Sequence, residues 1–502
     1  ITAGTLDTDS SNNYALTVGS GNLSASPGHV SVSGTLTCNA STVQVGSIKI
    51  ESGGTMTAPN ATMTVRSESA TGYCLENAGT FHHASNVIHI TGPTDSHASI
   101  KGFTSSHPLN NLYINNAGSN MVTYQEGALE IEGYLLLQDG TFNTQGQPDL
   151  DIIGDVTVNN GCKFFGESTA EITHRSLTIN SGGEYTATSG TTTITGEDSG
   201  GRAWDTAAGT FTHNNGKVVF NTGAIHTSIY TSGVGTEFND VELTTGASTW
   251  EVKWNTSGGT LLKIGGDLDI TTGSFEQNTN TDTVTVDGDV TIGANGKFNK
   301  DNDHTGPVNH GSLSIESGGV YNATTGTTTL TGNFANNGTF THNDGTLDMT
   351  GSNKYLNKVA SSTATTLYNL TCTHNTELGD KNNTFTVERT LTIASGKVLY
   401  VRSYPSGGNP VVLAMGKSTA SSVAEGGSIT GAGAIDFNNG TAACTVKGLN
   451  TVYPCVVDSA DWNWDGMTGA GDVRIANLDY DPDVITGGNG TTITLEGDCE
   501  FD

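Results

Sequence analysis

Residues 312–332 read SLSIESGGVYNATTGTTTLTG, and two copies of this stretch start at Ser47 and Ser176. The copy at Ser176 reads SLTINSGGEYTATSGTTTITG, whereas the copy at Ser47 is more diverged and reads SIKIESGGTMTAPNATMTV. The starts at Ser47, Ser176 and Ser312 lie 129 and 136 residues apart. Self-similarity at a nearly fixed period is the signature of a repeat architecture, so the sequence predicts a tandem array.

Two further blocks follow each copy in the same order. The block GTFH or GTFTH starts at Gly79, Gly209 and Gly338, with spacings of 130 and 129 residues. The block LNNLYI, FNDVEL or LYNLTC starts at Leu109, Phe238 and Leu367, with spacings of 129 and 129 residues. Three blocks in one order indicate modules of about 130 residues.

Within a module, short segments alternate apolar and polar residues, as in Ile48-Lys49-Ile50, and Gly-, Ser- and Asn-rich turns separate them. Apolar residues two apart indicate strands that bury one face. The strand–turn–strand unit recurs about every 20 to 25 residues, a length suited to one coil of a solenoid. We therefore predict an all-β, elongated β-solenoid (β-helix) without helices. Tandem β-sandwich modules are the alternative, because turns every 8 to 12 residues, roughly, also suit sandwiches.

The repeats divide the chain into five segments. These are a lead-in segment (1–15), repeat module 1 (16–134), repeat module 2 (135–267), repeat module 3 (268–390) and a partial, diverged module or cap (391–502).

The chain of 502 residues carries 20 basic and 50 acidic side chains, a net charge of −30. This charge disfavours nucleic acid and anionic membrane surfaces as partners, since both require a basic footprint. No run approaches the roughly 20 apolar residues that span a bilayer, so we expect no membrane insertion. The sequence begins at Ile1 without a Met or a signal peptide, as expected of a processed product or a part of a longer polypeptide.

Seven scattered Cys residues form no evident disulfide framework and no CxxC metal site. Cys444 and Cys455 are close enough in the sequence to be bridged. The alternative is that they are small buried residues.

The phrases GTFTHNNGKVVFNTG, LYNLTCTHNT and KIGGDLDITTGSF resemble the β-strand-repeat (β-solenoid) structural proteins of marine tailed phages, and also bacterial large repeat adhesins. The likeness covers nearly the whole chain. It is specific for architecture and brings no catalytic motif. It implies an extracellular structural or attachment protein on a virion or cell surface.

The sharpest local motif is DWNWDGMTGAGD, residues 461–472, which fits the calcium loop D-x-[DN]-x-[DN]-G-x5 followed by an acid. The predicted calcium ligands are Asp461, Asn463, Asp465 and Asp472. The final acid is the shorter Asp instead of Glu, and the flanks are not helical. The alternative is an ordinary turn that joins a strand bearing Trp462 and Trp464.

Other acidic side chains come in small clusters: Asp149, Asp151 and Asp155; Asp267 and Asp269; Asp287 and Asp289; and Asp301 and Asp303 beside His304. Two carboxylates at a suitable separation can hydrolyse a glycosidic bond. Solvation at polar strand positions or in turns explains most of these acids equally well.

Histidines recur at the matching repeat position, with His82 and His83 in module 1, His213 in module 2 and His342 in module 3. One module is too far along a stack of coils for them to share a metal ion. They are therefore predicted to be surface or turn residues.

Trp250 and Trp254 are four residues apart, and as core residues they would fill a wide coil, whereas exposed rings would stack on sugars. The segments TTTIT (191–195) and TTTLT (327–331) resemble the Thr ladders of ice-binding solenoids. Such a ladder needs Thr pairs in successive coils, and these segments occur once per module. They are interpreted as outward Thr on a β face.

Together these features predict a non-enzymatic extracellular or virion structural protein, a rigid rod for attachment or assembly. A bacterial cell-surface adhesin or filament protein and a polysaccharide-degrading tailspike are the alternatives. No cofactor is expected apart from the calcium ion considered above. The expected partners are a host-surface glycan or protein receptor, or copies of the chain in a homo-oligomer or filament.

Overall fold

The computed structural model describes the chain except for a set of short segments. These are residues 2–3, 19–27, 67–72, 93–97, 117–120, 126, 168, 224, 236, 247–248, 258, 278–280, 300–303, 357–363, 379–383, 402–410, 437–443, 451–454, 459–460, 464–472, 477, 482–484, 487–492, 497–499 and 502. The chain divides into two compact units. Unit 1 comprises Ile1–Gly246 and Trp254–Gly259, and unit 2 comprises Ala247–Lys253 and Thr260–Asp502.

Unit 1 contains a four-stranded and a nine-stranded sheet. The first consists of β1 (Thr5–Asp7), β4 (Thr35–Thr37), β7 (Thr55–Thr57) and β10 (Thr80–His82). The second consists of β3 (His29–Val32), β6 (Ser47–Ile50), β9 (Tyr73–Asn77), β12 (Ala98–Lys101), β14 (Met121–Gln125), β17 (Thr141–Asn143), β19 (Lys163–Phe165), β21 (Glu184–Thr186) and β24 (Thr210–Thr212).

Further strands of unit 1 form other sides of the coils. They are β2 (Leu16–Thr17), β5 (Val43–Val45), β8 (Thr62–Val65), β11 (Val87–Gly92), β13 (Asn111–Asn116), β15 (Leu129–Ile131), β16 (Leu135–Asp139), β18 (Leu150–Val158), β20 (Ile172–Ile179), β22 (Thr191–Ile194), β23 (Arg202–Asp205), β25 (Lys217–Phe220), β26 (Thr227–Thr231) and β27 (Asp240–Thr244). The strand β28 (Glu251–Thr256) has residues in both units.

Unit 2 contains a 15-stranded sheet. It consists of β29 (Leu261–Ile264), β31 (Thr283–Val286), β33 (Val308–His310), β36 (Thr327–Leu330), β39 (Thr346–Met349), β41 (Thr365–Cys372), β43 (Thr384–Ile393), β45 (Val411–Met415), β46 (Ser428–Thr430), β48 (Cys444–Gly448), β49 (Cys455–Asp458), β51 (Val473–Ala476), β52 (Leu478–Asp481), β54 (Ile493–Glu496) and β55 (Glu500–Phe501).

The other sides of the coils in unit 2 are also strands. They are β30 (Leu268–Gln277), β32 (Val290–Phe298), β34 (Leu313–Ile315), β35 (Val320–Asn322), β37 (Phe334–Asn336), β38 (Thr339–Thr341), β40 (Lys354–Leu356), β42 (Thr376–Leu378), β44 (Val398–Val401), β47 (Ala434–Asp436), β50 (Asp461–Asn463) and β53 (Ile485–Thr486). In the described part of the chain the one helix is α1 (Val423–Gly426), a single turn.

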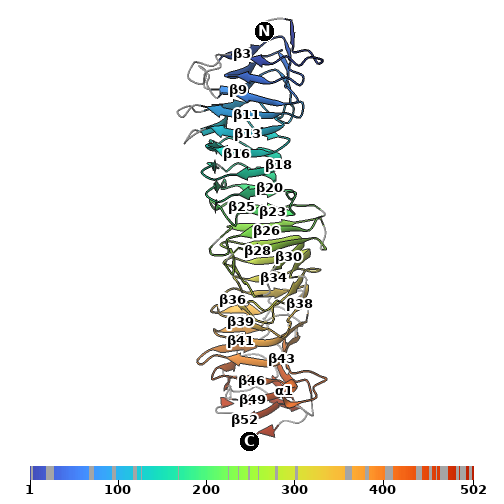
Figure 1. Cartoon of the computed structure of the whole chain (residues 1–502). Coiled ribbons are helices and arrows are strands. Elements are labelled where there is room, and N and C mark those ends of the chain that lie inside the picture. The colour runs from blue at the N-terminus through green and yellow to red at the C-terminus, as the bar shows by residue number, and fades with distance from the viewer. Residues whose placement is uncertain are drawn as a thin grey trace. The chain divides into compact units, whose positions relative to one another are not determined.

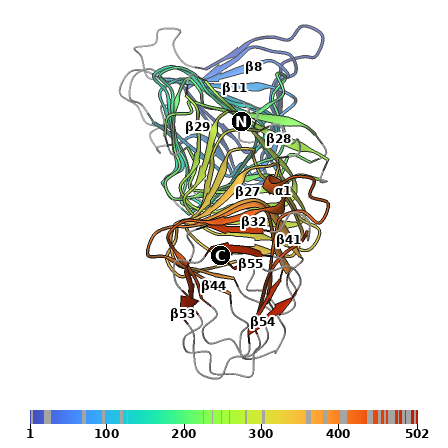
Figure 2. The ribbon, with the colours of Figure 1, turned by 90° about the horizontal axis from the view of Figure 1, so that it is seen from below.

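The strands in each unit pair in parallel with strands one coil away in the sequence. In unit 2, for example, Thr327–Leu330 of β36 pairs in register with Thr346–Met349 of β39. Figure 1 shows the labelled strands of each unit following one another in sequence order, and Figure 2 shows unit 2 along its stack, with strands on several sides of the coil. The β-solenoid prediction is confirmed. The sandwich alternative is wrong, since a sandwich requires antiparallel pairing.

The core of each unit is an apolar strip produced by alternation along the strands. In β36, Thr328 and Leu330 are buried, whereas Thr327 and Thr329 are partly exposed. Because the register is kept from coil to coil, like side chains stack on one another.

Aromatic side chains form in-register stacks inside both units. In unit 1, Phe142 pairs with Phe164 and Phe164 with Tyr185, and the last two rings are parallel within 3° at 4.2 Å between centroids. In unit 2, Phe298 stacks on Tyr321 at 4.6 Å, and Tyr321 stacks on Phe340 at 5.7 Å. Stacked rings bury large areas and fix the register between coils.

Candidate functional site

The repeated histidines lie at the first position of tight turns. His213 and His342 are each followed by two residues with positive φ and then by Gly216 or Gly345, whose backbone N–H donates to the histidine carbonyl at 2.9 Å. Positive φ at both central positions is the geometry of a type I′ turn, which joins strands tightly. The sequence prediction of turn histidines agrees with this geometry.

The imidazole ring itself takes part in the turn. Nδ1 of His342 accepts a hydrogen bond from the backbone N–H of Asp344 at 3.0 Å, and Nδ1 of His213 accepts one from Asn215 at 3.1 Å. In module 1 the equivalent residue is His83, which accepts from Ser85 at 3.4 Å. Each histidine therefore satisfies a backbone donor that the turn would otherwise leave to solvent.

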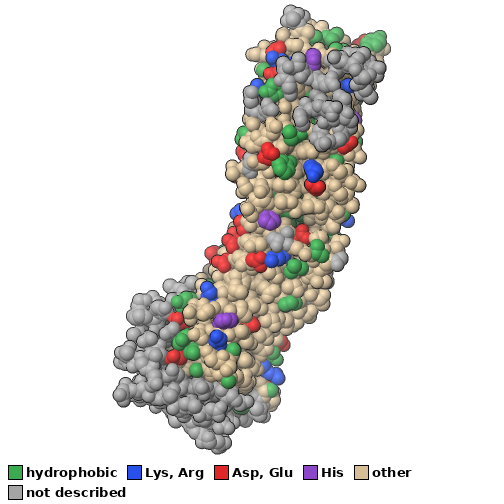
Figure 3. All heavy atoms as spheres, turned by 90° about the vertical axis from the view of Figure 1, so that its left-hand side faces the viewer, with side chains coloured by type: hydrophobic (Ala, Val, Ile, Leu, Met, Phe, Trp, Pro, Cys, Tyr) green, Lys and Arg blue, Asp and Glu red, His purple; other side chains and the backbone are tan. Residues whose placement is uncertain are grey.

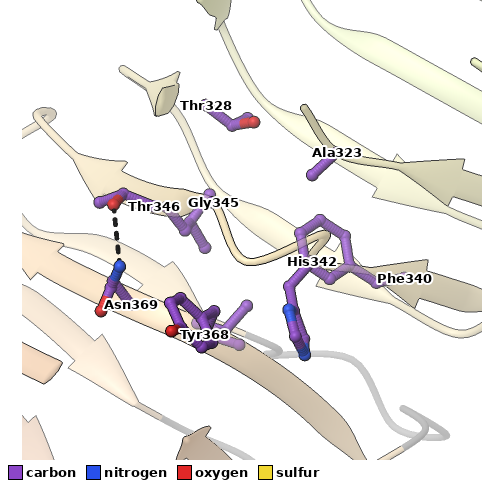
Figure 4. Close-up of a pocket in the computed structure, with 10 residues that line it drawn as sticks. Ala323, Thr328, Phe340, His342, Gly345, Thr346, Tyr368 and Asn369 are labelled. Atoms are coloured by element: carbon purple, nitrogen blue, oxygen red, sulfur yellow. Dashed lines mark hydrogen bonds between the residues drawn. The ribbon is translucent and has the colours of Figure 1, made fainter. Parts of the chain in front are cut away.

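A small hollow lies beside the turn histidine of module 3, in unit 2 (Figure 4). Its lining residues are Ala323, Thr328, Phe340, His342, Gly345, Thr346, Leu347, Leu367, Tyr368 and Asn369. The cavity volume is about 10 Å³, which is room for one water molecule. The rings of His342 and Tyr368 stack with 5.7 Å between centroids.

Two charged side chains lie next to the histidine and tyrosine of this hollow. Oε2 of Glu388 lies 3.4 Å from Nζ of Lys417 and 3.6 Å from Nε2 of His342. Nζ of Lys417 also lies 5.9 Å from the centre of the Tyr368 ring, a cation–π distance. The Glu388 carboxylate is the main cause that raises the pKa of Lys417. We call His342, Tyr368, Glu388 and Lys417 the module-3 cluster.

The aromatic member of this cluster distinguishes module 3 from the other two. At the position of Tyr368, module 1 has Asn110 and module 2 has Asn239. The histidine–carboxylate contact does recur in module 1, where Nε2 of His83 lies 3.1 Å from Oε2 of Glu132. The sequence repeats predicted the histidine, whereas Glu388 and Lys417 lie outside the repeated blocks and gave no signal.

The module-3 cluster combines an aromatic stack with an ion pair. Here one carboxylate, Glu388, is shared between a lysine and a histidine. The cluster can offer a stacked aromatic edge and a balanced pair of charges to a partner.

The acidic clusters predicted from the sequence mostly hold neighbouring coils together. Asp155 bonds Nε of Arg175 at 2.8 Å and the Ser176 hydroxyl at 2.7 Å. Burial alone would raise the pKa of Asp155, but these two partners hold it below its ordinary value. In unit 2, a carboxylate oxygen of Asp267 accepts from the backbone N–H of Asp289 at 2.8 Å.

The fourth acidic cluster lies largely outside the described residues. Asp301 and Asp303 belong to the segment that the structure leaves undescribed. His304 is buried in unit 2, and its Nε2 lies 2.9 Å from Oε1 of Glu276, which is also buried. The sequence placed His304 beside two aspartates, and in the structure a glutamate from the preceding coil is a partner of its ring.

The predicted calcium ligands are only partly covered by the structure. Asp461 and Asn463 are the ends of β50, and they pair in register with Ala434 and Asp436 of β47. Asp465 and Asp472 lie outside the described residues. The calcium site therefore stays a prediction. Among the described residues, no group of three or more His, Cys, Asp or Glu side chains is arranged to hold a metal ion.

Comparison with protein-family models, with curated proteins and with solved structures finds no match to this chain. The site must therefore be interpreted from its own geometry.

Two further sequence predictions concern tryptophan and cysteine. Trp254 is buried in unit 1, where its indole N–H donates to the Thr231 hydroxyl at 2.9 Å, whereas Trp250 is only partly buried. Cys455 is a buried free thiol in unit 2, so a bridge from Cys455 to Cys444 is not formed. The core interpretation holds for Trp254 and Cys455. Within the described residues, no helix is long and apolar enough to cross a bilayer.

Proposed function

We propose that this chain is a structural, fibre-like β-solenoid protein of an extracellular or virion-borne assembly, where it displays surface for attachment. One observation carries the proposal: successive coils keep one register, so their ladders and core stacks continue from coil to coil. In unit 2, the core ring of Tyr321 pairs in register with Phe298 before it and Phe340 after it. Such stacking provides stability without a cofactor and leaves the outer faces free to vary.

The dispersed surface charge supports a role in display. On the face that Figure 3 shows, acidic and basic side chains are scattered among neutral polar side chains and backbone. The net charge of −30 keeps copies of such a protein soluble at high local concentration.

The test is localisation in the source of the sequence. An antibody against the purified chain is applied to gradient-purified virus particles and to intact cells. Labelling of particles supports a virion appendage, and labelling of the cell surface supports the adhesin alternative. Confinement to the cell interior would overturn both.

Enzymatic activity provides a second, separate test. The purified chain is incubated with a broad panel of polysaccharides, and their length is measured. Shortening of any of them would contradict a purely structural role and favour a polysaccharide-degrading tailspike.

A further inference from the structure

Eight strands of the large sheet in unit 2 place a polar side chain at one shared register position. The strands are β29, β31, β33, β36, β39, β41, β43 and β46. The residues, in that order, are Lys263, Thr285, Asn309, Thr329, Asp348, Thr371, Thr392 and Thr430. The register passes through all eight strands without a gap. These residues form the first row.

A second row runs parallel to the first, two residues earlier in each strand. Its in-register members on β36, β39, β41, β43 and β46 are Thr327, Thr346, Asn369, Thr390 and Ser428. Thr283 holds the same place relative to Thr285 on β31. Two apolar residues also fall at this position: Leu261 on β29, which pairs with Thr283, and Pro307, two residues before Asn309. Both rows consist mainly of hydroxyl side chains. We call the two rows together the hydroxyl face.

The hydroxyl face points away from the core. In β31, β36 and β39 the burial pattern alternates so that both row positions are partly exposed and the residues between them are buried. Thr283, Thr285, Thr327 and Thr329 follow this pattern. The rows are therefore presented to solvent on a surface whose backbone is fixed by the ladder beneath it.

Hydrogen bonds along the rows fix several of these side chains. Nδ2 of Asn309 donates to the Thr285 hydroxyl at 3.2 Å, and Nδ2 of Asn369 donates to the Thr346 hydroxyl at 3.3 Å, as Figure 4 shows. The hydroxyls of Thr392 and Thr430 lie 3.2 Å apart. Because these hydrogen bonds already order the side chains of the face, a ligand that binds there costs little further side-chain entropy.

The hydroxyl face is nearly neutral in a strongly acidic chain. Only Lys263 and Asp348 among the residues of the two rows are ionisable. The copy of the Thr-rich segment in unit 1 (191–195) has different neighbours on the adjacent strands. Thr191 pairs in register with Lys217, and Thr193 pairs with Val219, which in turn pairs with Glu242. The neutral array is therefore a property of unit 2 and not of the Thr-rich segment as such.

The spacing of the array is set by β-sheet geometry. Neighbouring strands lie about 4.8 Å apart, and residues two apart in a strand are about 6.6 Å apart. The hydroxyls thus form a two-dimensional lattice of donors and acceptors, with Thr methyl groups between them. Ice is also a regular lattice of hydrogen-bond donors and acceptors, because its water oxygens repeat at spacings of the same order.

We propose that the hydroxyl face binds the surface of ice. Water held by the rows would adopt the spacing of the array and join the lattice. Ionised groups would oppose this by holding a liquid-like hydration shell, so the scarcity of charge in the rows is part of the argument. Asp348, between Thr329 and Thr371, is the exception within the first row. No aromatic ring belongs to either row, and the Tyr368 ring beside Asn369 is stacked on His342. Both facts disfavour a sugar polymer that would stack on exposed rings. The proposal does not depend on the virion or cell-surface role proposed above.

The test measures how much of the purified chain is carried into slowly growing ice, together with the inhibition of ice recrystallisation. Two variants interrupt the first row, Thr329→Lys and the double variant Thr329→Lys/Thr371→Lys. Each added lysine introduces charge and bulk at an outward position, away from the core. The matched control is Thr193→Lys in unit 1, since Thr193 and Thr329 lie in copies of one segment. Unchanged circular dichroism and melting temperature show that each variant is folded.

The expected result is that the wild type and Thr193→Lys enter the ice, while Thr329→Lys enters less and the double variant is excluded. Exclusion of the wild type would overturn the proposal, as would an equal loss for Thr193→Lys. A double variant that still enters ice but loses self-association or binding to an insoluble polysaccharide would also overturn it. That outcome would identify a second copy or a glycan as the occupant of the face.

Discussion

In the core of unit 2, Nε2 of His310 lies 2.9 Å from the hydroxyl oxygen of Tyr321. The same pair recurs in module 2, where His174 and Tyr185 lie 3.5 Å apart in unit 1. All four side chains are buried. At the equivalent positions module 1 has Val45 and Met56, which are also buried. One core position is thus filled either by a hydrogen-bonded polar pair or by apolar side chains.

Acid should destabilise the chain through these histidines. Burial lowers the pKa of His310 to about 3 and that of His174 to about 4, whereas the unfolded chain has the ordinary value of about 6.5. Between these values the unfolded state binds more protons than the folded state. The stability that depends on these neutral histidines is therefore fully present above about pH 6.5. Below that pH the free energy of unfolding decreases by about 1.4 kcal/mol per pH unit for each histidine.

Denaturant unfolding at about pH 7, 6 and 5 measures how the free energy of unfolding changes with pH, which we call the slope. The double variant His310→Val/Tyr321→Met introduces the module 1 residues, and we expect a smaller slope for it than for the wild type. His82→Asn, at an exposed position, is the control and should leave the slope unchanged. Equal slopes in all three proteins would contradict the prediction.

The turn histidine of module 3 should contribute to stability through its ring. His342→Ala removes the acceptor for the Asp344 N–H, and we expect a loss of about 1 kcal/mol in the free energy of unfolding. His342→Asn should recover part of this loss, because an Asn side chain can accept the same hydrogen bond two residues on. Thermal unfolding of the three proteins provides the measurement. An Asn variant no better than Ala would show that the loss comes from the ring stack with Tyr368.

The described cysteines should be unreactive in the folded chain. Burial raises the pKa of the Cys74, Cys372 and Cys455 thiols to about 12, and that of Cys162 to about 11. For Cys38 burial and the charge of Asp7 together raise the pKa to about 12. Almost no thiolate, the reactive form, is then present near pH 8.

A thiol reagent at pH 8, roughly, checks this in the variant Cys444→Ser/Cys499→Ser, which retains five of the seven cysteines. We expect negligible labelling of the folded protein and labelling of all five thiols after denaturation. Rapid labelling before denaturation would show that at least one of these coils opens readily.

The loop at 461–472 gives a prediction for metal addition. If its carboxylates bind calcium, millimolar calcium should raise the melting temperature of the wild type, because a ligand that binds only the folded state stabilises it. Asp465→Asn should reduce the shift. Glu316→Gln removes one charge from an exposed turn and is the matched control. A wild-type melting temperature that does not respond to calcium would contradict calcium binding by this motif.

The sequence by itself determined the architecture. Copies that start at Ser47, Ser176 and Ser312 required a repeated supersecondary unit, and the alternation within them required strands with one buried face. Both signals are local, so they remain visible without knowledge of which strands pair. The turn role of His342 followed for the same reason, since its block recurs in all three modules.

Only the tertiary structure decided which residues become neighbours across the coils. The interpretation of the segment at 327–331 as outward Thr on a β face is confirmed, since Thr327 and Thr329 are partly exposed. The sequence did not show which residues lie beside them in the neighbouring coils. Coil register places Thr285, Thr329 and Thr392 in one row, although different strands and turns separate them. The offset between coils varies with turn length, and turn length is not periodic. Faces that depend on that offset, such as the hydroxyl face and the module-3 cluster, therefore appear only in the folded chain.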